Sequence, residues 1–214
     1  MKEYDDINKL IERLPEVKQC KSQINQAYEY LKNAFISKNK YLICGNGGSS
    51  ADADHMVAEL VKSFYRKRIL SQELKQKLEQ LGERGIYLAN HLESSIPAYS
   101  LSSQSAAMTA IANDQGYDLS FSQQIIGYGE KDDILVAFTT SGRSENVINA
   151  IHTAHALDMH IICFTGNHES FIGANLCDVI IKAPSNDTYR IQEYHLSIYH
   201  TLCLILEKEL FQQK

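Results

Sequence analysis

The stretch YLICGNGGSSADADHMVAEL, residues 41–60, decides how this chain folds. Four apolar residues predict a short buried strand, a glycine-rich turn follows at residues 45–48, and the remainder predicts a helix. A helix that starts at such a turn offers unpaired backbone N–H groups and the positive end of its dipole, which favour a phosphate. His55 and Glu59 lie four residues apart, on one face of that helix. The stretch therefore predicts an anion site beside an imidazole and a carboxylate that suit proton chemistry.

The glycine-rich turn is a weak signal when it is taken alone. It lacks the Gly-Lys-Ser/Thr of a nucleotide P-loop and the GxGxxG spacing of a dinucleotide site. A tight connection between strand and helix explains the same glycines. The rest of the sequence is needed to distinguish an anion site from a tight connection between strand and helix.

The composition is that of a globular protein with one domain. At 214 residues and 44% hydrophobic content, the chain can bury a sizeable core. A formal net charge of −5 argues against nucleic acid or an anionic membrane as the main partner. No apolar run reaches the roughly 18 residues of a membrane span, and the acidic segment MKEYDDINKL lacks a signal-peptide core. The five cysteines form no CxxC pair, so we expect reduced thiols and a cytoplasmic location.

Four further apolar, β-branched runs follow the first strand, with helical patterns between them. Strand–helix alternation of this kind predicts a parallel sheet with helices on both faces. Before the sheet, residues 5–37 predict two helices or one helix kinked at Pro15. After it, residues 189–210 predict one long helix. The five predicted strands are residues 41–44, 98–101, 134–138, 160–164 and 179–181.

Residues 71–93 form a helical excursion between the first helix of the sheet and the second strand. They carry leucines at helical spacing and many Gln, Lys and Glu residues, where a plain connection would be shorter. Two interpretations stay open: a solvated pair of surface helices, or a lid or subunit-contact element.

A second loop, TTSGRS at residues 139–144, also lies between a predicted strand and a helix. Its four hydroxyls exceed what ordinary N-capping needs, because one hydroxyl caps a helix. Hydroxyls and amides at a helix N-terminus hold a phosphate without a lysine. Open α/β sheets bind ligands at the carboxyl ends of their strands, where both loops fall. The pair of loops therefore favours an anion site more strongly than either loop alone.

Two polar constellations remain. Asn113 and Asp114, in ANDQGY, are candidates for contacts with sugar hydroxyls, although a helix C-cap with a turn at Gly116 explains the segment too. Gln192 and His200 lie eight residues apart on the last helix, about 12 Å along its axis. One chain cannot easily aim both at one small site, so we expect His200 to reach a neighbouring subunit's pocket. The other histidines are expected to be surface or packing residues: His91, His152, His155, His160 and His168.

Together these elements resemble the SIS (sugar isomerase) domain family and, within it, the phosphoheptose isomerases. The resemblance implies a doubly wound, flavodoxin-like five-stranded parallel sheet in a single SIS domain over residues 1–214. The helical patterns add an N-terminal helical extension at residues 1–38, an inserted helical segment at 66–95 and a long helix at the C-terminus, and the resemblance covers nearly the whole chain except the excursion at 71–93. The matching stretches are CGNGGSSADADHMVAEL, AIANDQGYD, FTTSGRSENVINA, LDMHIICFTG and RIQEYHLSIYH.

The resemblance also implies an activity. Phosphoheptose isomerases convert sedoheptulose 7-phosphate to D-glycero-D-manno-heptose 7-phosphate through an enediol, towards the heptose of bacterial surface glycans. It implies a homotetramer with sites at subunit interfaces. Glu59 would be the base at carbon, if burial lifts its pKa, and His200 would move a proton between the oxygens.

Site residues carry over from the resemblance position by position. Zinc, where a member of the family binds it, would polarise the carbonyl, one ion per site. Its ligands would be His55, Glu59, Gln192 and His200. The substrate contacts would be Asn46, Gly47, Gly48, Glu59, Asn113, Asp114, Thr139, Thr140, Ser141, Ser144 and Gln192.

The chain departs from the family directly after Glu59. It reads Leu60-Val61-Lys62-Ser63 where phosphoheptose isomerases commonly have a Gly-Arg pair. Lys62 can replace the charge of that arginine but not its planar geometry. Two alternatives to the isomerase stay open: a non-catalytic SIS protein that binds phosphosugars or regulates, like the replication-initiator-associating relatives, and another phosphosugar reaction, such as one on an amino-sugar phosphate. A protein that only binds has no need for both Glu59 and His200.

Overall fold

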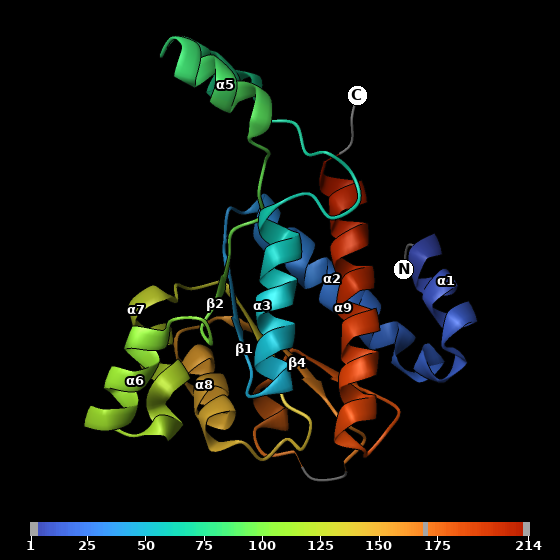
Figure 1. Cartoon of the computed structure of the whole chain (residues 1–214). Helices are drawn as coiled ribbons and strands as arrows, with labels where there is room; N and C mark the ends of the chain where they lie inside the picture. The colour runs from blue at the N-terminus through green and yellow to red at the C-terminus, as the bar shows by residue number, and fades with distance from the viewer. Residues whose placement is uncertain (1–3, 169–170, 212–214) are drawn as a thin grey trace.

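A five-stranded parallel sheet forms the centre of the protein, whose computed structural model describes residues 4–168 and 171–211 (Figure 1). The strand order is β2-β1-β3-β4-β5, which is the flavodoxin-like order and confirms the predicted fold class. Tyr41 at the start of β1 pairs with Ala98 on one side and Ile134 on the other. The predicted strands agree with the observed ones to within one residue at each end: β1 Tyr41–Cys44, β2 Ala98–Ser100, β3 Ile134–Phe138, β4 His160–Thr165 and β5 Val179–Lys182.

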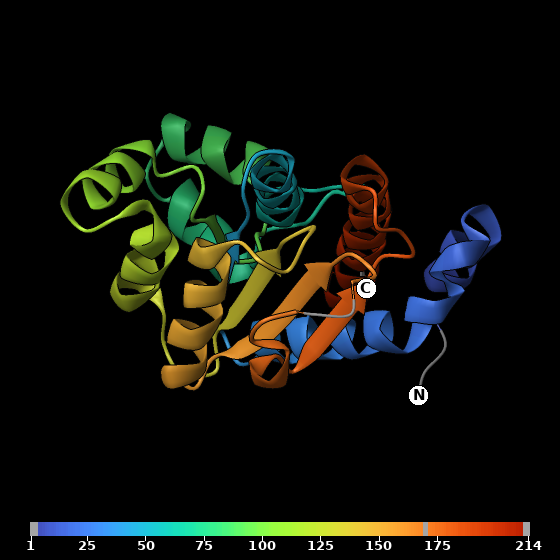
Figure 2. The same cartoon turned by 90° about the horizontal axis from the view of Figure 1, so that it is seen from below.

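Helices cover both faces of the sheet (Figure 2). Alternate residues of each strand point to opposite faces, so Ile43 joins a different core from Leu42. The larger core is shared with α1 (Asp5–Arg13), η1 (Pro15–Cys20), α2 (Lys21–Ile36), α3 (Gly48–Val61) and α9 (Thr188–Leu210). The other core is shared with α6 (Ser105–Asp114), α7 (Ser120–Tyr128), α8 (Glu145–Ala156) and η3 (Ala174–Leu176), while η2 (Tyr117–Leu119) links α6 to α7.

The N-terminal helices follow the prediction for residues 5–37. Pro15 opens the short helix η1, where its missing N–H costs nothing, and separates α1 from α2. The last helix, α9, lies beside α3, and the two run in the same direction (Figure 1). Gln192 of α9 lies against Gly48 at the start of α3. Seven residues further along each helix, Tyr199 of α9 lies against His55 of α3. No helix within residues 4–168 and 171–211 is long and apolar enough to cross a membrane.

The helical excursion consists of α4 (Gln72–Glu79) and α5 (Glu83–His91), which stand away from the sheet as a hairpin (Figure 1). A Cβ atom on Gly85 would lie 1.8 Å from the carbonyl oxygen of Leu78, so glycine is what lets the two helices touch. Within these two helices only Gly85 and Ala89 are buried. Leu81 at the turn is 71% exposed. The hairpin therefore adds little to the core of the chain.

Candidate active site

A reciprocal pair of amides joins the loop after β1 to the first turn of α8, the helix that follows the loop after β3. Nδ2 of Asn46 donates to Oδ1 of Asn146 over 2.8 Å, and Nδ2 of Asn146 donates back to Oδ1 of Asn46 over 2.9 Å. The hydroxyl of Tyr117 donates to the same Oδ1 of Asn46 over 3.0 Å. Asn46 is a predicted substrate contact, and its side chain also fixes the loop after β1 against the start of α8. Asn146 and Tyr117 are not among the predicted site residues.

Two glycines shape the start of α3. Gly47 has φ +57°, a conformation that favours glycine. A Cβ atom on Gly48 would lie 2.5 Å from Nε2 of Gln192, so the absence of a side chain lets that amide lie against the helix start. The structure thus brings Gly48 and Gln192 together, as two predicted substrate contacts.

The hydroxyl-rich loop after β3 is folded partly by its own side chains. Oγ1 of Thr139 accepts a hydrogen bond from the N–H of Gly142 over 3.1 Å, and Oγ of Ser141 accepts one from the N–H of Arg143 over 3.3 Å. A hydroxyl that accepts can still donate its own proton to a phosphate oxygen. Ser144 occupies the N-cap of α8, yet its side chain makes no capping hydrogen bond. Its hydroxyl is therefore available for a ligand at a helix N-terminus.

Asn113 and Asp114 end α6 and are exposed. Nδ2 of Asn113 donates to Oδ1 of Asp114 over 2.8 Å, and no described contact joins either of them to the loops after β1 and β3. Gly116 has φ +131° and its N–H donates to the carbonyl of Ile111, as expected for the end of a helix. The segment reaches the site through Tyr117 instead.

A second cluster of side chains lies further along α3 and α9. Nε2 of His55 lies 3.2 Å from Oε1 of Glu59 and 3.4 Å from Nε2 of His200. The Glu59 side chain is 13% exposed, and its Oε2 is buried without a hydrogen bond. Burial and the neighbouring His55 lower the pKa of His200 below its ordinary value. A neutral imidazole and a carboxylate oxygen that is open to a proton therefore lie within one small cluster.

Buried Tyr199 and half-buried Asp52, which the sequence did not single out, support this cluster. The hydroxyl of Tyr199 lies 3.0 Å from Nδ1 of His55 and 3.5 Å from Oδ1 of Asp52. Burial raises the pKa of Asp52 to about 6, although the hydrogen bond with Tyr199 acts against the shift. The only sequence signal for Tyr199 is its position next to His200 in RIQEYHLSIYH.

The two clusters lie at different levels of the same helix pair. From Gly48 to Glu59 the axis of α3 rises by roughly three turns, or about 16 Å. The expected separation of Gln192 and His200 is therefore present, while the expected reach of His200 into a neighbouring subunit's pocket stays a prediction. His200 needs no neighbouring subunit to reach Glu59, because His200 lies beside His55 and Glu59 of its own chain. Gln192 is the residue that lies away from them.

The same separation determines whether the four implied ligands of one chain can bind one zinc ion. The described part of the chain contains no group of three or more His, Cys, Asp or Glu placed to hold a metal ion. His55, Glu59 and His200 lie close together, whereas the amide of Gln192 lies at Gly48. The four implied ligands therefore do not form one site within a single chain.

Lys62 lies next to the cluster, where the chain departs from the family pattern. Its Nζ lies 3.5 Å from Oε2 of Glu59, and its side chain is 64% exposed. Such an exposed ion pair contributes little to stability. Lys62 thus places a positive charge near Glu59, as expected, but as a mobile point charge.

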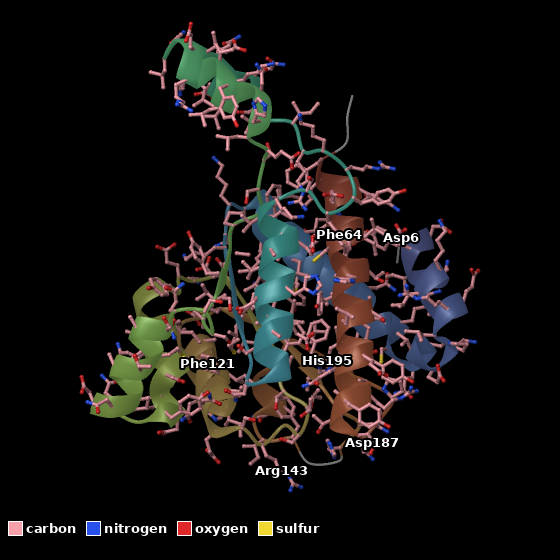
Figure 3. The ribbon with its side chains drawn as sticks, viewed as in Figure 1. Asp6, Phe64, Phe121, Arg143, Asp187 and His195 are labelled. Atoms are coloured by element: carbon pink, nitrogen blue, oxygen red, sulfur yellow. The ribbon has the colours of Figure 1, made fainter. Side chains whose placement is uncertain are left out.

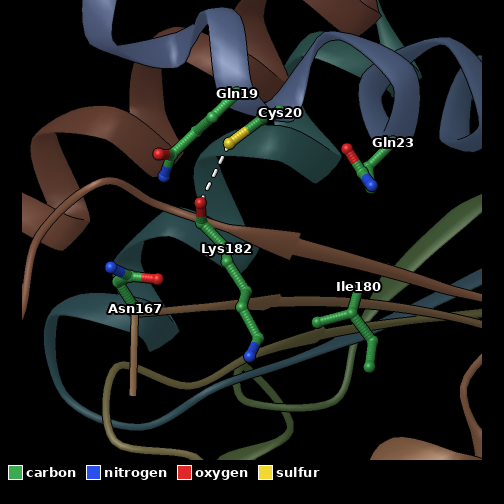
Figure 4. A pocket seen from close by; sticks show the side chains of 6 residues that line it. All are labelled: Gln19, Cys20, Gln23, Asn167, Ile180 and Lys182. Carbon is green, nitrogen blue, oxygen red and sulfur yellow. Dashed lines mark hydrogen bonds between the residues drawn. The ribbon is translucent and has the colours of Figure 1, made fainter. Parts of the chain in front are cut away.

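The cavities of the chain lie elsewhere. A cavity of about 320 Å³ opens between the first helices and the outer strand β5, where Cys20 donates to the carbonyl of Lys182 over 2.9 Å (Figure 4). No predicted site residue lines this cavity or either of the other two described cavities.

Comparison with known proteins identifies the family of this chain. The family model described as SIS domain matches residues 4–166. A phosphoheptose isomerase of Aliarcobacter butzleri is 39% identical over 206 residues, which cover 96% of this chain and 92% of that protein. The structure of a phosphoheptose isomerase from Francisella tularensis superposes with a TM-score of 0.75 at 29% identity, over 97% of this chain and 100% of that one. That of Neisseria gonorrhoeae gives a TM-score of 0.73 at 32% identity, over 94% and 95%.

Fold and match together make this chain a SIS-domain protein. The similarity also extends past the matched domain, through α9 with Gln192 and His200, to nearly the whole length of the relatives. The chain belongs to the phosphoheptose isomerase family.

Proposed function

We propose that this protein is an aldose–ketose isomerase that converts sedoheptulose 7-phosphate to D-glycero-D-manno-heptose 7-phosphate, a step of heptose biosynthesis. The curated relatives of the chain carry the name phosphoheptose isomerase. The observation that carries the chemistry is the contact of His55 with both Glu59 and His200. A protein that only bound a sugar phosphate would not need this cluster.

The proposed reaction moves a proton from C1 to C2 through an enediol. Glu59 removes the C1 proton with its Oε2, which makes no hydrogen bond in the chain. His200 transfers a proton between the O1 and O2 atoms, because a neutral imidazole can both donate and accept. Its lowered pKa keeps His200 in that form near neutral pH. His55 holds Glu59 in place through the 3.2 Å contact.

The proposed phosphate site is the loop after β3. Its hydroxyls and the N-terminus of α8 supply donors of the kind that phosphate oxygens accept. The start of α3, with Asn46, Gly47, Gly48 and Gln192, would contact the sugar. Asn113 and Asp114 would bind hydroxyls further along the sugar chain.

The separation of the two clusters favours a site shared between subunits of a homotetramer. A sugar held by the loops of one chain would have to span about 16 Å to meet Glu59 on the same α3. A neighbouring subunit that lays its α3 and α9 over those loops removes this difficulty. In this arrangement His55, Glu59 and His200 act together from one chain, and the binding loops belong to another.

Zinc belongs to the proposal only as a property of the assembled protein. Gln192 would join His55, Glu59 and His200 from a neighbouring subunit, and no step of the reaction is assigned to the ion. Elemental analysis of the purified tetramer tests this point: we expect one zinc ion per chain, and a zinc-free protein that stays so after incubation with zinc contradicts it.

The remaining parts of the proposal concern organisation. We propose one SIS domain over residues 1–214, with the N-terminal helices at 1–38 and the inserted segment at 66–95. All five cysteines are free, which supports a cytoplasmic location.

Isotope exchange tests the function directly. The protein is incubated with sedoheptulose 7-phosphate in deuterium oxide, and C1 of the ketose and C2 of the aldose are followed by NMR. We expect an aldose product and deuterium at these carbons. Neither turnover nor exchange, with or without added zinc, would contradict the proposed function, and binding without turnover would favour a regulatory protein.

A further inference from the structure

An ion pair with no solvent exposure joins the segment after α3 to α9. Nε of Arg68 lies 2.9 Å from Oε1 of Glu207, and both side chains are 0% exposed. Removing two charges from water is costly, so such a pair persists only where further hydrogen bonds satisfy both groups. Both groups have these additional partners.

The remaining donors of Arg68 bind the end of α3. Nη1 donates to the carbonyl of Leu60 over 2.5 Å, and Nη2 donates to the carbonyl of Glu59 over 2.7 Å. Carbonyls in the last turn of a helix have no partner within the helix. The guanidinium therefore caps α3 at the residue that is the proposed base.

The carboxylate of Glu207 holds the chain that leaves α3. It accepts the backbone N–H groups of Phe64, Tyr65 and Arg66, each over 2.8 Å. Burial works against the ionised form, but these N–H groups and Arg68 outweigh it and lower the pKa of Glu207. The ring of Phe64 lies 5.2 Å from the ring of His200, and Figure 3 shows Phe64 beside the upper half of α9. The same carboxylate thus places a side chain that packs on His200.

Glu207 and His200 share one face of α9, because a separation of seven residues is two helical turns. That face contacts α3 and the segment that follows it. His200 lies against His55 of α3, and Glu207 forms its ion pair with Arg68 of the following segment. The spacing of α3 and α9 near the proposed base is consequently set by the guanidinium between them. We infer that Arg68 is a positioning residue for the isomerase reaction, which holds Glu59 and His200 at the separation that proton transfer requires.

Paired substitutions test this inference, which rests on the proposed isomerase activity. Arg68→Gln removes the buried guanidinium and its charge, and Arg66→Gln is the matched control, because Arg66 binds Glu207 through its backbone and its side chain is exposed. We expect Arg68→Gln to lower kcat about 10- to 100-fold, since a shift of about 1 Å costs that much, while KM changes by less than about 3-fold. Arg66→Gln should match the wild type in both. Equal kinetics for the two variants would overturn the inference.

A more conservative variant and a spectroscopic reading separate positioning from stability. Arg68→Lys keeps the buried charge with fewer donors, and we expect it to recover part of the lost kcat. It also serves if Arg68→Gln does not fold. In NMR spectra the ring signals of His55 and His200 should shift in Arg68→Gln or Arg68→Lys and stay in place in Arg66→Gln. Unshifted rings would overturn the inference even if activity fell.

The failure of the inference can be told from the failure of the proposed function. A wild-type protein without turnover or exchange contradicts the function. The ring signals still test Arg68 in that case, because they need no substrate.

Discussion

The two parts of the candidate site are built in different ways. At the carboxyl ends of β1 and β3, amides and hydroxyls bond to one another and to backbone groups, so the loops are largely satisfied before any ligand arrives. Midway along α3 and α9, titratable side chains lie together, and one oxygen of Glu59 is buried without a hydrogen bond. The first part is suited to holding a charged sugar in a fixed place, and the second to exchanging protons.

One helix pair can therefore serve two tasks. The start of α3 offers backbone N–H groups and a dipole, which favour anions. Three turns later the same helix presents an imidazole and a carboxylate to α9. Because the two tasks are about 16 Å apart in one chain, we propose that different subunits of an assembly supply them for one sugar.

The largest effect is expected when the reactive group of the proton-exchanging part is removed. Glu59→Gln keeps the shape but cannot accept a proton, so kcat should fall by about 1,000-fold, or about 4 kcal/mol, with little change in KM. Ser144→Ala should do the reverse and raise KM with a small effect on kcat. Steady-state kinetics of the two variants test this difference between the two parts of the site. If both variants change kcat and KM in the same way, the two parts do not have different tasks.

The next effect concerns the dependence of the free energy of unfolding on pH through His195 of α9. Burial lowers the pKa of His195 to about 4, although its contact with the carbonyl of Thr165 acts against the shift. The folded state thus favours neutral His195, while the unfolded chain takes up a proton below about pH 6.5. The contribution of neutral His195 to the free energy of unfolding should be fully present above about pH 6.5. The free energy of unfolding should fall by about 3 kcal/mol between pH 6.5 and pH 4. Urea unfolding across this range measures it.

The helix cluster should respond to pH with the opposite sign. Asp52 has its pKa raised to about 6 by burial, so its protonation stabilises the folded state as the pH falls through 6. His195→Gln should therefore flatten the loss of stability between pH 6.5 and pH 4, and Asp52→Asn should steepen it. Identical pH profiles for both variants would contradict the assignment of these two groups.

A smaller effect is expected from the amide pair between the loop after β1 and the start of α8. Asn146→Leu leaves Nδ2 of Asn46 without its partner, which should cost about 1–2 kcal/mol and raise KM about 10-fold. Asn149→Leu is the control on the same helix, because Asn149 bonds to Asp118 and not to the loops. If the two variants raise KM equally, the amide pair does not organise the sugar site.

The smallest effect lies outside both parts, in the hairpin of α4 and α5. Leu81→Ala should change the free energy of unfolding by less than about 0.5 kcal/mol, because its side chain is 71% exposed. Leu202→Ala on α9, at 0% exposure, should cost about 2–5 kcal/mol. Denaturant unfolding compares them, and a large loss for Leu81→Ala would show that the hairpin is covered in the native protein.

Much of this arrangement could be predicted from the sequence. Apolar runs fix the strands, because a strand buried on both faces has no room for polar residues, as β1 and β3 show. The pair at His55 and Glu59 was visible because it depends only on spacing within one helix. The two hydroxyl- and glycine-rich loops were visible for the same reason.

Contacts between distant segments could not be predicted. Tyr199 meets His55 across 144 residues of sequence, and Asn46 meets Asn146 across 100. Spacing showed that Gln192 and His200 lie apart, but it could not show which of them lies beside Glu59. Arg68 was hidden in a segment rich in exposed charges, and only the packing of Glu207 shows that it is buried.

Subunit mixing tests the central claim most directly, namely that the proton-exchanging cluster and the binding loops for one sugar belong to different chains. Glu59→Gln subunits are co-assembled with Ser141→Ala/Ser144→Ala subunits and assayed at a substrate concentration far below the raised KM, where each form alone is nearly inactive. We expect the mixed assembly to regain activity well above either parent, because some interfaces then combine an intact Glu59 with an intact loop. If the mixture shows only the average activity of its two parents, each site lies within one chain and the account is wrong.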